Sequence, residues 1–299
     1  MENFVLIIIA ILIGYALQKF KIFSQETPII LNQYIIYISL PAIILLQVPK
    51  LNISIDIIIP AIIAWFVMLL SAGLVLLFSK YFKWSKEITG SLLLVAVLSN
   101  SSIAGIPLLN TYIGEKAIPY VIIYDQLGTF IALATYGTLI TALYSNNKGT
   151  TPRIIVQKVI TFPPFMSLIV AFCFLGVEFP PLLTSILKDF SYTLIPVALV
   201  AVGLQLKFKM PKSDLQPLSI ALLIKLIIGP IIAYFVAVLF GWQHTLASDV
   251  SILEAGMSPM ITAGAIAAMV GLAPRLSTAI VGYGIVVSFL TTYVISRIL

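Results

Sequence analysis

The amino-acid sequence predicts an all-α, polytopic membrane protein with ten transmembrane helices, and three observations lead to this prediction. Hydrophobic residues make up 61% of the 299-residue chain and charged residues 9%, with a mean hydropathy of +1.13. Soluble domains carry roughly 25% charged residues, so 17 basic and 11 acidic side chains cannot cover a soluble protein of this size. The apolar residues form runs of bilayer-spanning length, and basic residues gather in alternate loops between them.

Ten apolar runs follow one another along the chain, bounded by polar or charged residues. We place them at residues 4–18, 29–47, 57–79, 88–109, 118–143, 162–177, 190–206, 216–240, 248–270 and 277–298. The first and sixth are shorter than the others. The first run follows Met-Glu-Asn, which lacks a positive charge, and lysines rather than a small-residue cleavage site come after it. We therefore interpret it as a retained span and not as a signal peptide.

Basic residues are concentrated in the loops that follow the odd-numbered runs. These residues are Lys19, Lys21, Lys80, Lys83, Lys86, Lys148, Arg153, Lys158, Lys207, Lys209, Lys212 and Arg275. Because positively charged loops remain in the cytoplasm, both termini are expected on the outer side of the cell (inner) membrane. The net charge of +6 is dispersed over these loops, so we expect a lipid bilayer and no nucleic acid as the partner.

The two halves of the chain are interpreted as an inverted repeat of five spans each. An offset of 158 residues takes Trp84 to Trp242 and Asn100 to Ser258, and the short first run then corresponds to the short sixth. The predicted boundaries are 1–143 for the first repeat, 144–161 for a cytoplasmic linker and 162–299 for the second repeat. Chance alignment of two apolar halves is the alternative. Inverted repeats with paired interrupted helices are typical of secondary transporters.

Polar residues interrupt the fourth and the ninth runs near the middle of the membrane. With a rise of ~1.5 Å per residue, Asn100 lies ~18 Å from one end of its run and Ser258 ~15 Å from the opposite end of its own. We expect Ser258 to cap a following half-helix, with Pro259 in its first position. Ser101 or Ser102 is expected to cap the other. Free N–H groups at such helix starts suit an anion, whereas a packing kink satisfied by serine is the plainer alternative.

Three ionisable residues lie inside predicted spans, where a charge costs roughly 2.5–3.5 kcal/mol even on a mild scale. Asp125 is in the fifth span, Lys225 in the eighth, and Glu254 in the ninth, one turn before its break. Such residues mark ion or substrate paths. Two alternatives stay open: Lys225 extends to the membrane surface, or the two carboxylates pair with it and only hold helices together.

The oxygen-bearing side chains near the breaks also suit a coupling ion. Asp125 and Thr129 are four residues apart and are expected on one helix face. Together with Ser99, Asn100 and Glu254 they offer hard oxygen ligands for Na⁺, or a carboxylate pair that binds H⁺. The chain has one cysteine, one histidine and no phosphate-binding loop, so an enzyme, an ATP-driven pump and a Cys- or His-based metal centre have no support. No cofactor is expected, apart from Na⁺ as a possible coupling ion.

Three motifs stand at the breaks and around the buried lysine. They are Asn100-Ser-Ser-Ile-Ala-Gly105-Ile-Pro107-Leu108, Leu253-Glu254-Ala-Gly-Met257-Ser258-Pro259 and Lys225-Leu-Ile-Ile-Gly-Pro230. Together they resemble the auxin efflux carrier family of bacterial permeases and plant PIN proteins. The resemblance implies a scaffold of helices 1, 2, 6 and 7, often dimeric, and a transport domain of helices 3–5 and 8–10. It also implies elevator-like motion, with small organic anions such as indole acetate, malate or malonate held at crossing helices 4 and 9.

A second resemblance concerns sodium. Glu254-Ala-Gly-Met257 and Ser99-Asn100 are similar to sodium-binding motifs of the related bile acid sodium symporters. In that family an amide residue follows the methionine, whereas this chain has Ser258 and Pro259. Glu254 is therefore the best single candidate for coupling.

The sequence thus predicts a secondary transporter of a small organic carboxylate, expected to form a homodimer through the scaffold helices. The substrate is expected at Asn100, Ser101, Ser102, Gly105, Lys225, Ser258 and Pro259, and the coupling ion at Ser99, Asn100, Asp125, Thr129, Glu254 and Met257. The alternative is a membrane-embedded sensor that uses the same pocket without transport. A channel is less favoured, because breaks with mixed charges near the midplane suit an occluded site better than a continuous pore.

Overall fold

The computed structural model describes residues 2–24, 26–50, 55–145, 160–205 and 214–299, and its regular structure there is helical. Six stretches are long and apolar enough to cross a membrane, by length and composition: Thr27–Lys50, Ile59–Phe82, Glu115–Tyr144, Pro181–Leu204, Leu215–Leu239 and Pro274–Ile298. Two shorter apolar helices are Ile9–Lys19 and Pro163–Cys173. The prediction of an all-helical polytopic membrane protein is confirmed at this level. Most of the predicted linker 144–161 and the basic loop residues 207–212 lie outside the described residues.

The first half contains three long helical stretches and one interrupted pair. Its elements are α1 (Glu2–Lys19), α2 (Thr27–Tyr34), η1 (Ile35–Ser39), α3 (Leu40–Gln47), η2 (Val48–Lys50), η3 (Ile55–Ile57), α4 (Ile59–Phe82), α5 (Lys86–Val95), η4 (Ser101–Gly105), α6 (Ile106–Tyr112), η5 (Glu115–Ala117), α7 (Ile118–Ile123), η6 (Tyr124–Phe130), η7 (Leu133–Gly137) and α8 (Thr138–Tyr144). The segments η1, η4, η6 and η7 are π-type turns, which are wider than the α-helix. Five residues, 96–100, separate α5 from η4.

The second half also contains both long and interrupted helices. Its elements are α10 (Pro163–Cys173), α11 (Pro181–Tyr192), α12 (Leu194–Gln205), α13 (Leu215–Leu223), η9 (Ile224–Ile228), α14 (Gly229–Leu239), α15 (Leu246–Ala255), α16 (Ile261–Met269) and α17 (Pro274–Ile298). Both interrupted pairs begin with a side-chain cap: Ser85 accepts a hydrogen bond from the Ile88 N–H, and Thr245 from the Ser248 N–H. These caps fix where α5 and α15 start, because an uncapped first turn leaves N–H groups without partners.

The seventh span begins earlier than predicted. Its helical stretch starts at Pro181, whereas the predicted run starts at residue 190. Lys188 and Asp189 resemble loop residues in the sequence, but α11 carries them on its exposed side, and the Lys188 ammonium lies over the Tyr192 ring at 5.5 Å. An amphipathic helix can carry charged residues on one face without ending there. The prediction that the span begins after this charge pair is therefore wrong.

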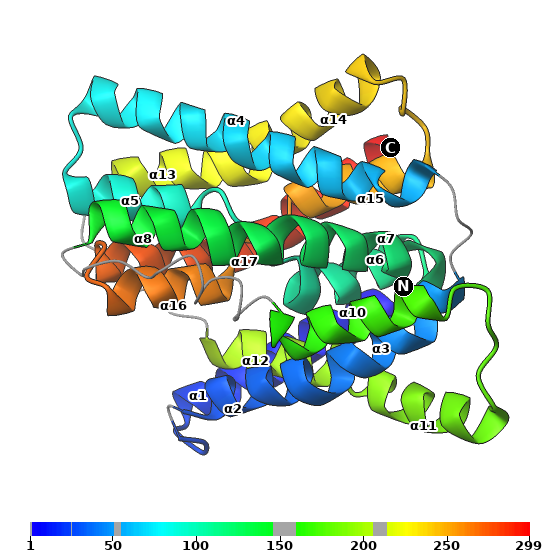
Figure 1. Ribbon diagram of the computed structural model, residues 1–299. Coiled ribbons are helices and arrows are strands. Elements are labelled where there is room, and N and C mark those ends of the chain that lie inside the picture. Colours follow the sequence, from blue (N-terminus) through cyan, green and yellow to red (C-terminus); the bar gives the residue numbers. More distant parts are fainter. Residues whose placement is uncertain (1, 25, 51–54, 146–159, 206–213) are drawn as a thin grey trace.

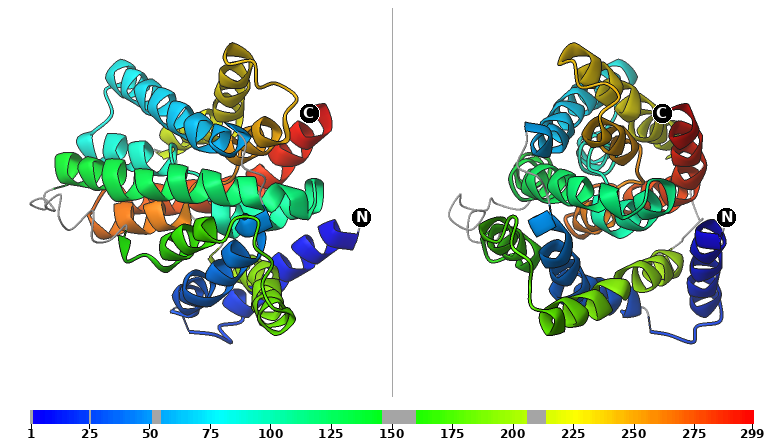
Figure 2. Two further views of the ribbon diagram at one scale, coloured as in Figure 1. Left: turned by 45° about the vertical axis from the view of Figure 1, so that its right-hand side comes forward. Right: turned by 90° about the vertical axis from the view of Figure 1, so that its right-hand side faces the viewer.

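One group of helices is formed by α1, α2, α3, α10, α11 and α12, which lie together in the lower part of Figure 1 and remain together in both views of Figure 2. The contact between α1 and α12 is made by glycine. A Cβ atom on Gly14 would lie 2.3 Å from the Val200 carbonyl oxygen, and one on Gly203 would lie 2.2 Å from that of Ile11. Small residues therefore allow these two backbones to touch, as in other packed membrane helices.

The second group surrounds the interruptions. Helix α4 packs against α14, α15 and η6 in the upper part of Figure 1, while α16 packs against α5 and α17. The turn η4 and helix α6 also contact α12, so the segment after the first break lies between the two groups. This arrangement places the breaks in the interior of the helical assembly and not on its lipid-facing surface.

Candidate functional site

The two breaks meet and pair through their backbones. Ser99 and Pro259 form an isolated antiparallel β-bridge. The Asn100 N–H donates to the Ser258 carbonyl oxygen at 2.9 Å, and the Met260 N–H donates to the Leu98 carbonyl oxygen at 3.0 Å. Backbone that leaves a helix inside a membrane needs such partners, because the bilayer core supplies none. Residues 158 positions apart in the chain thus form one crossing.

The predicted caps at the breaks are wrong. Helix α16 begins at Ile261, after an extended Met260, and no side chain caps it, so Pro259 is not its first residue and Ser258 is not its cap. Ser101 does not cap the other half-helix, because its hydroxyl bonds to Asp125. The backbone of each break instead pairs with that of the other through the N–H groups of Asn100 and Met260.

Pro259 is held in this extended conformation by close packing. A Cβ atom on Gly284 of α17 would lie 2.3 Å from Pro259 Cδ, so the proline ring rests directly on that glycine. Proline has no N–H to offer a bridge, and here the neighbouring residue, Met260, supplies the donor instead.

Asp125 lies in the π-type turn η6, where its carboxylate is buried and surrounded by donors. The Ser101 hydroxyl donates to Oδ1 at 2.6 Å, and Gln126 Nε2 donates to Oδ2 at 2.5 Å. Ser102 adds contacts through its hydroxyl and its backbone N–H. Hydrogen bonds to a carboxylate stabilise its negative charge, so this group has the partners that an ionised side chain needs. Asp125 and both predicted serines therefore form one cluster.

Lys225 lies in the π-type turn η9 and is 2% exposed. Its Nζ donates to Ser99 Oγ at 2.5 Å and to the Ala255 carbonyl oxygen at 2.7 Å. Ala255 is the last residue of α15, so the ammonium group compensates the negative end of that half-helix. Lys225 consequently joins the two breaks, and the alternative in which it extends to the membrane surface is wrong.

Glu254 is fully buried, and neither carboxylate oxygen has a hydrogen-bond partner among the residues that the structure describes. The group rests on the backbone of Gly105, where an added Cβ would lie 2.1 Å from Oε1. Electrostatic interactions reach it from Asp125 and Lys225, although the hydrogen bonds of Lys225 go to a hydroxyl and a carbonyl. A buried carboxylate without donors is costly, so Glu254 requires a proton or a nearby cation.

The other predicted residues surround this centre. Asn100 Nδ2 donates to Ser258 Oγ over 3.4 Å, and Met257 is fully buried in the core. Thr129 lines a cavity of about 10 Å³ together with Ser99 and Tyr124, separate from the Asp125 cluster. That volume is at the lower limit for one water-sized occupant.

Sequence reasoning missed two buried polar residues at the site. Tyr124 is fully buried beside Ser99 and Glu254, and Gln126 is fully buried beside Asp125. A tyrosine in an apolar run is ambiguous, but an uncharged amide next to a buried carboxylate is a signal that could have identified Gln126. Trp65 supports the same turn, because its Nε1 donates to the Leu127 carbonyl oxygen at 3.0 Å.

The donor set bears on which ion could bind. Within the described part of the chain, no three His, Cys, Asp or Glu side chains come together as a metal cluster. A cation at the crossing would therefore depend on hydroxyl and carbonyl oxygens as well as a carboxylate, which is the hard-oxygen environment of alkali and alkaline-earth ions and not that of a transition metal.

Known proteins match nearly the whole chain. A family model described as membrane transport protein matches residues 1–296. An uncharacterized transporter of Methanocaldococcus jannaschii is 28% identical over 275 residues, which cover 88% of this chain and 87% of that protein. An uncharacterized transporter of Methanothermobacter thermautotrophicus is 22% identical over 269 residues, covering 89% and 87% respectively.

Proposed function

Because the chain belongs to the membrane transport protein family, that of the auxin efflux carriers and PIN-like permeases, we propose that it is a secondary active transporter of a small organic carboxylate. The family is one of transporters and not of enzymes. The substrate site in this proposal is the crossing of the two breaks, at Asn100, Ser101, Ser102, Gly105, Lys225, Ser258 and Pro259. The observation that carries the proposal is the buried, unpartnered carboxyl group of Glu254.

The charges of the crossing explain why transport of an anion would be coupled to a cation. If all three groups are ionised, Lys225, Asp125 and Glu254 leave one negative charge, which repels a carboxylate. Donors stabilise the charge on Asp125, whereas none stabilises that on Glu254. A proton or Na⁺ on Glu254 removes the excess negative charge. In this mechanism the anion and the cation enter the site together.

Two cations fit this role. A proton needs only the Glu254 carboxyl group. A Na⁺ ion would use oxygen atoms of Asn100, Asp125, Thr129 and Glu254, with Ser99 and Met257 beside them. Of these residues, Ser99 and Thr129 line the small cavity. Uptake measured under an imposed H⁺ gradient and, separately, under an imposed Na⁺ gradient distinguishes the two cations.

The proposed mechanism is elevator-like alternating access in a ten-span, 5+5 inverted repeat with both termini outside. Spans 1, 2, 6 and 7, which are α1, α2–α3, α10 and α11–α12, would form the scaffold of a homodimer. Spans 3–5 and 8–10 would carry the crossing as a transport domain. This division is supported by the packing of α1, α2, α3, α10, α11 and α12 as one group and by the contact of η4 with α12 at its border.

The test is Glu254→Gln in purified protein reconstituted into liposomes. The amide mimics the protonated carboxyl group, so we expect carboxylate exchange across the membrane to continue while accumulation driven by a H⁺ or Na⁺ gradient falls at least tenfold. Glu115→Gln, at an exposed carboxylate at the start of the fifth span, is the matched control and should accumulate substrate like the wild type. Wild-type accumulation by Glu254→Gln would show that coupling lies elsewhere.

A membrane-embedded ligand sensor is the second candidate, because a sensor would use the same buried pocket. Binding without flux distinguishes it: a carboxylate that raises the thermal stability of the protein but never crosses the liposome membrane would favour the sensor.

A further inference from the structure

Helices α4 and α14 both end in a stacked pair of aromatic rings. The ring centroids of Phe82 and Trp84 are 5.7 Å apart, with 19° between the ring planes. Those of Phe240 and Trp242 are 4.6 Å apart, with 13° between the planes. Corresponding rings are 158 positions apart in the chain, the offset that also relates the two breaks. We name these pairs the Trp84 stack and the Trp242 stack.

The backbone makes the same turn at both stacks. Lys83 and Gly241 lie between the stacked residues in the chain, and both are left-handed, with φ 52° and φ 71°. The tryptophan N–H that follows bonds to the Ser79 carbonyl at 3.1 Å in one stack and to the Ala237 carbonyl at 2.8 Å in the other. In Figure 1, α4 ends beside α5 and α14 ends on the opposite side, so the stacks lie at opposite ends of one helical face.

The distance between the stacks is close to the thickness of a bilayer core. The Phe240 ring lies 5.8 Å from the ring of Phe66, which precedes Phe82 by 16 residues on α4. At ~1.5 Å per residue the stacks are ~24 Å apart, against ~30 Å for the hydrocarbon core. The α4 residues between them include four exposed leucines, Leu69, Leu70, Leu76 and Leu77. Aromatic residues at both ends of an apolar face are typical of the two membrane–water interfaces.

The two stacks differ in charge. Three exposed lysines surround the Trp84 stack: Lys80, Lys83 and Lys86. Glu87 is the one acidic residue in the sequence from 57 to 114, and its exposed carboxylate accepts a hydrogen bond from Ser85. Residues 238–248, around the Trp242 stack, contain no lysine, arginine, aspartate or glutamate. The same aromatic geometry therefore occurs once with an excess of positive charge and once without it.

We propose that the Trp84 stack and its three lysines are a binding site for the headgroup of an anionic phospholipid. The ammonium groups bind the headgroup phosphate, and the aromatic rings lie at the boundary between headgroups and acyl chains. A zwitterionic lipid is bound less well, because its own cationic group is repelled by the lysines. The Trp242 stack contacts lipid without a preference for charge. This site goes beyond the transport function and does not depend on it.

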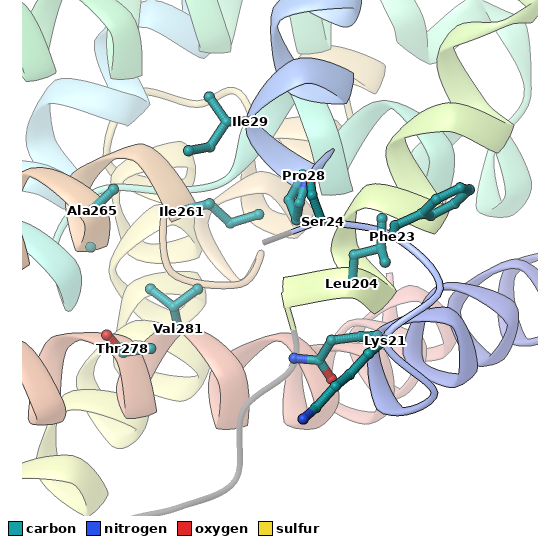
Figure 3. Close-up of a pocket in the computed structure, with 12 residues that line it drawn as sticks. Lys21, Phe23, Ser24, Pro28, Ile29, Leu204, Ile261, Ala265, Thr278 and Val281 are labelled. Atoms are coloured by element: carbon teal, nitrogen blue, oxygen red, sulfur yellow. The ribbon is translucent and has the colours of Figure 1, made fainter. Parts of the chain in front are cut away.

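The site is separate from the large cavity between the two groups of helices. That cavity, of about 580 Å³, is lined by residues of α1, the loop after it, α2, α12, α16 and α17 (Figure 3). The residues of the Trp84 stack and its lysines are not among the described residues that line it. The lipid site is therefore a surface of α4 and α5 that faces the bilayer and not an internal pocket.

The three tryptophans of the chain allow a direct test. Trp242→Phe leaves Trp84 as the reporter and Trp84→Phe leaves Trp242, while phenylalanine preserves each stack. Trp65, whose Nε1 bonds to the Leu127 carbonyl, is a shared background. Tryptophan fluorescence is measured in vesicles with brominated phosphatidylglycerol or brominated phosphatidylcholine as the quencher. Quenching of Trp84 should show a preference of about fivefold for phosphatidylglycerol, and quenching of Trp242 none.

Variants of the lysines test the source of this preference. Lys83→Gly reproduces the residue found at Gly241 and removes the cost of a left-handed lysine, so it is expected to fold and to lower the preference about twofold. Replacement of all three, by Lys80→Gln, Lys83→Gly and Lys86→Gln, should abolish it. Lys188→Gln, at an exposed lysine of α11, is the matched control and should leave it unchanged. Equal preferences at Trp84 and Trp242, or a preference that persists in the triple variant, would overturn the proposal.

A gain of binding is tested at the other stack. Gln243→Lys adds a lysine at an exposed position next to Trp242, and in the Trp84→Phe protein it should create a preference for phosphatidylglycerol. Added NaCl should weaken both preferences, because salt screens exposed charges. Inorganic phosphate that weakens the Trp84 preference more than NaCl of equal ionic strength would assign the lysines to a soluble anion and overturn the lipid site.

Discussion

Gly105 is the residue on which the buried carboxyl group of Glu254 rests. It belongs to η4, just after the first break, whereas Glu254 is the penultimate residue of α15, the half-helix before the second break. The contact is close enough that the carbon of a single methyl group would lie 2.1 Å from Oε1 and overlap it. The absence of a side chain at residue 105 is therefore a condition for the position of Glu254.

Gly105→Ala is expected to lower stability by about 1–3 kcal/mol, because the added methyl group would overlap the fully buried Glu254 carboxyl group. Coupled uptake should fall along with the unfolding temperature, since the displaced carboxyl group is the proposed coupling residue. Thermal unfolding in detergent and liposome uptake measure the two effects.

The control for this substitution is Gly73→Ala. Gly73 lies inside α4, where an added Cβ meets nothing within 4 Å. The same change should leave uptake unaltered and raise helix stability by roughly 0.5–1 kcal/mol. Similar losses at residues 73 and 105 would contradict the close contact with Glu254.

At the scale of elements, the three buried ionisable residues of the site all lie where the α-helix is interrupted. Asp125 is in the π-type turn η6, Lys225 is in η9, and Glu254 is in the last turn of α15. Such departures from α-helical hydrogen bonding are frequent at functional sites. Lys225 connects these elements, because its ammonium group bonds both to Ser99 and to the end of α15.

Lys225→Met should separate the two breaks. The methionine fills a similar volume but leaves the Ala255 carbonyl and the Ser99 hydroxyl without their donor, at a cost of about 1–3 kcal/mol. We expect a lower unfolding temperature and loss of uptake. Lys188→Met, which removes an exposed lysine over the Tyr192 ring, should change stability by no more than about 0.5 kcal/mol. Equal stability of the two variants would contradict a joining role for Lys225.

The residues of the candidate site could be predicted from the sequence better than the contacts between them. Charges in apolar runs revealed Asp125, Lys225 and Glu254, because burying them needs a special reason. The polar residues of both breaks could be predicted in the same way. The backbone hydrogen bond between Asn100 and Ser258 could not be predicted, because main-chain hydrogen bonds do not depend on residue type.

Local rules also failed where tertiary contacts replaced them. Ser101 and Ser258 have the composition of helix caps, yet Ser101 bonds to Asp125 and Ser258 belongs to the backbone pairing. The expectation that Asp125 and Thr129 share a face assumed an α-helix, whereas η6 is wider. Lys188 and Asp189 concealed α11 because exposed charges on a helix resemble those of a loop.

At the scale of the whole molecule, the distribution of basic residues predicts which loops face the cytoplasm. In a Cys173→Ser background, a cysteine replacing exposed Glu178 should react with an impermeant maleimide added outside intact cells. A cysteine replacing exposed Lys83 should react only after the membrane is opened. The reversed labelling pattern would invert the proposed topology, and labelling of both sites from outside would contradict the span count between them.

The main-chain bridge between Ser99 and Pro259 has a consequence for how the sequence of the site can diverge in evolution. Its two hydrogen bonds use N–H and carbonyl groups that almost every residue possesses, so the meeting of the breaks survives most substitutions of their side chains. Selection can then vary the polar groups at Asn100, Ser101 and Ser258 without dismantling the geometry around them. Descendants of one ancestral gene could in this way acquire different cargoes while keeping the same backbone.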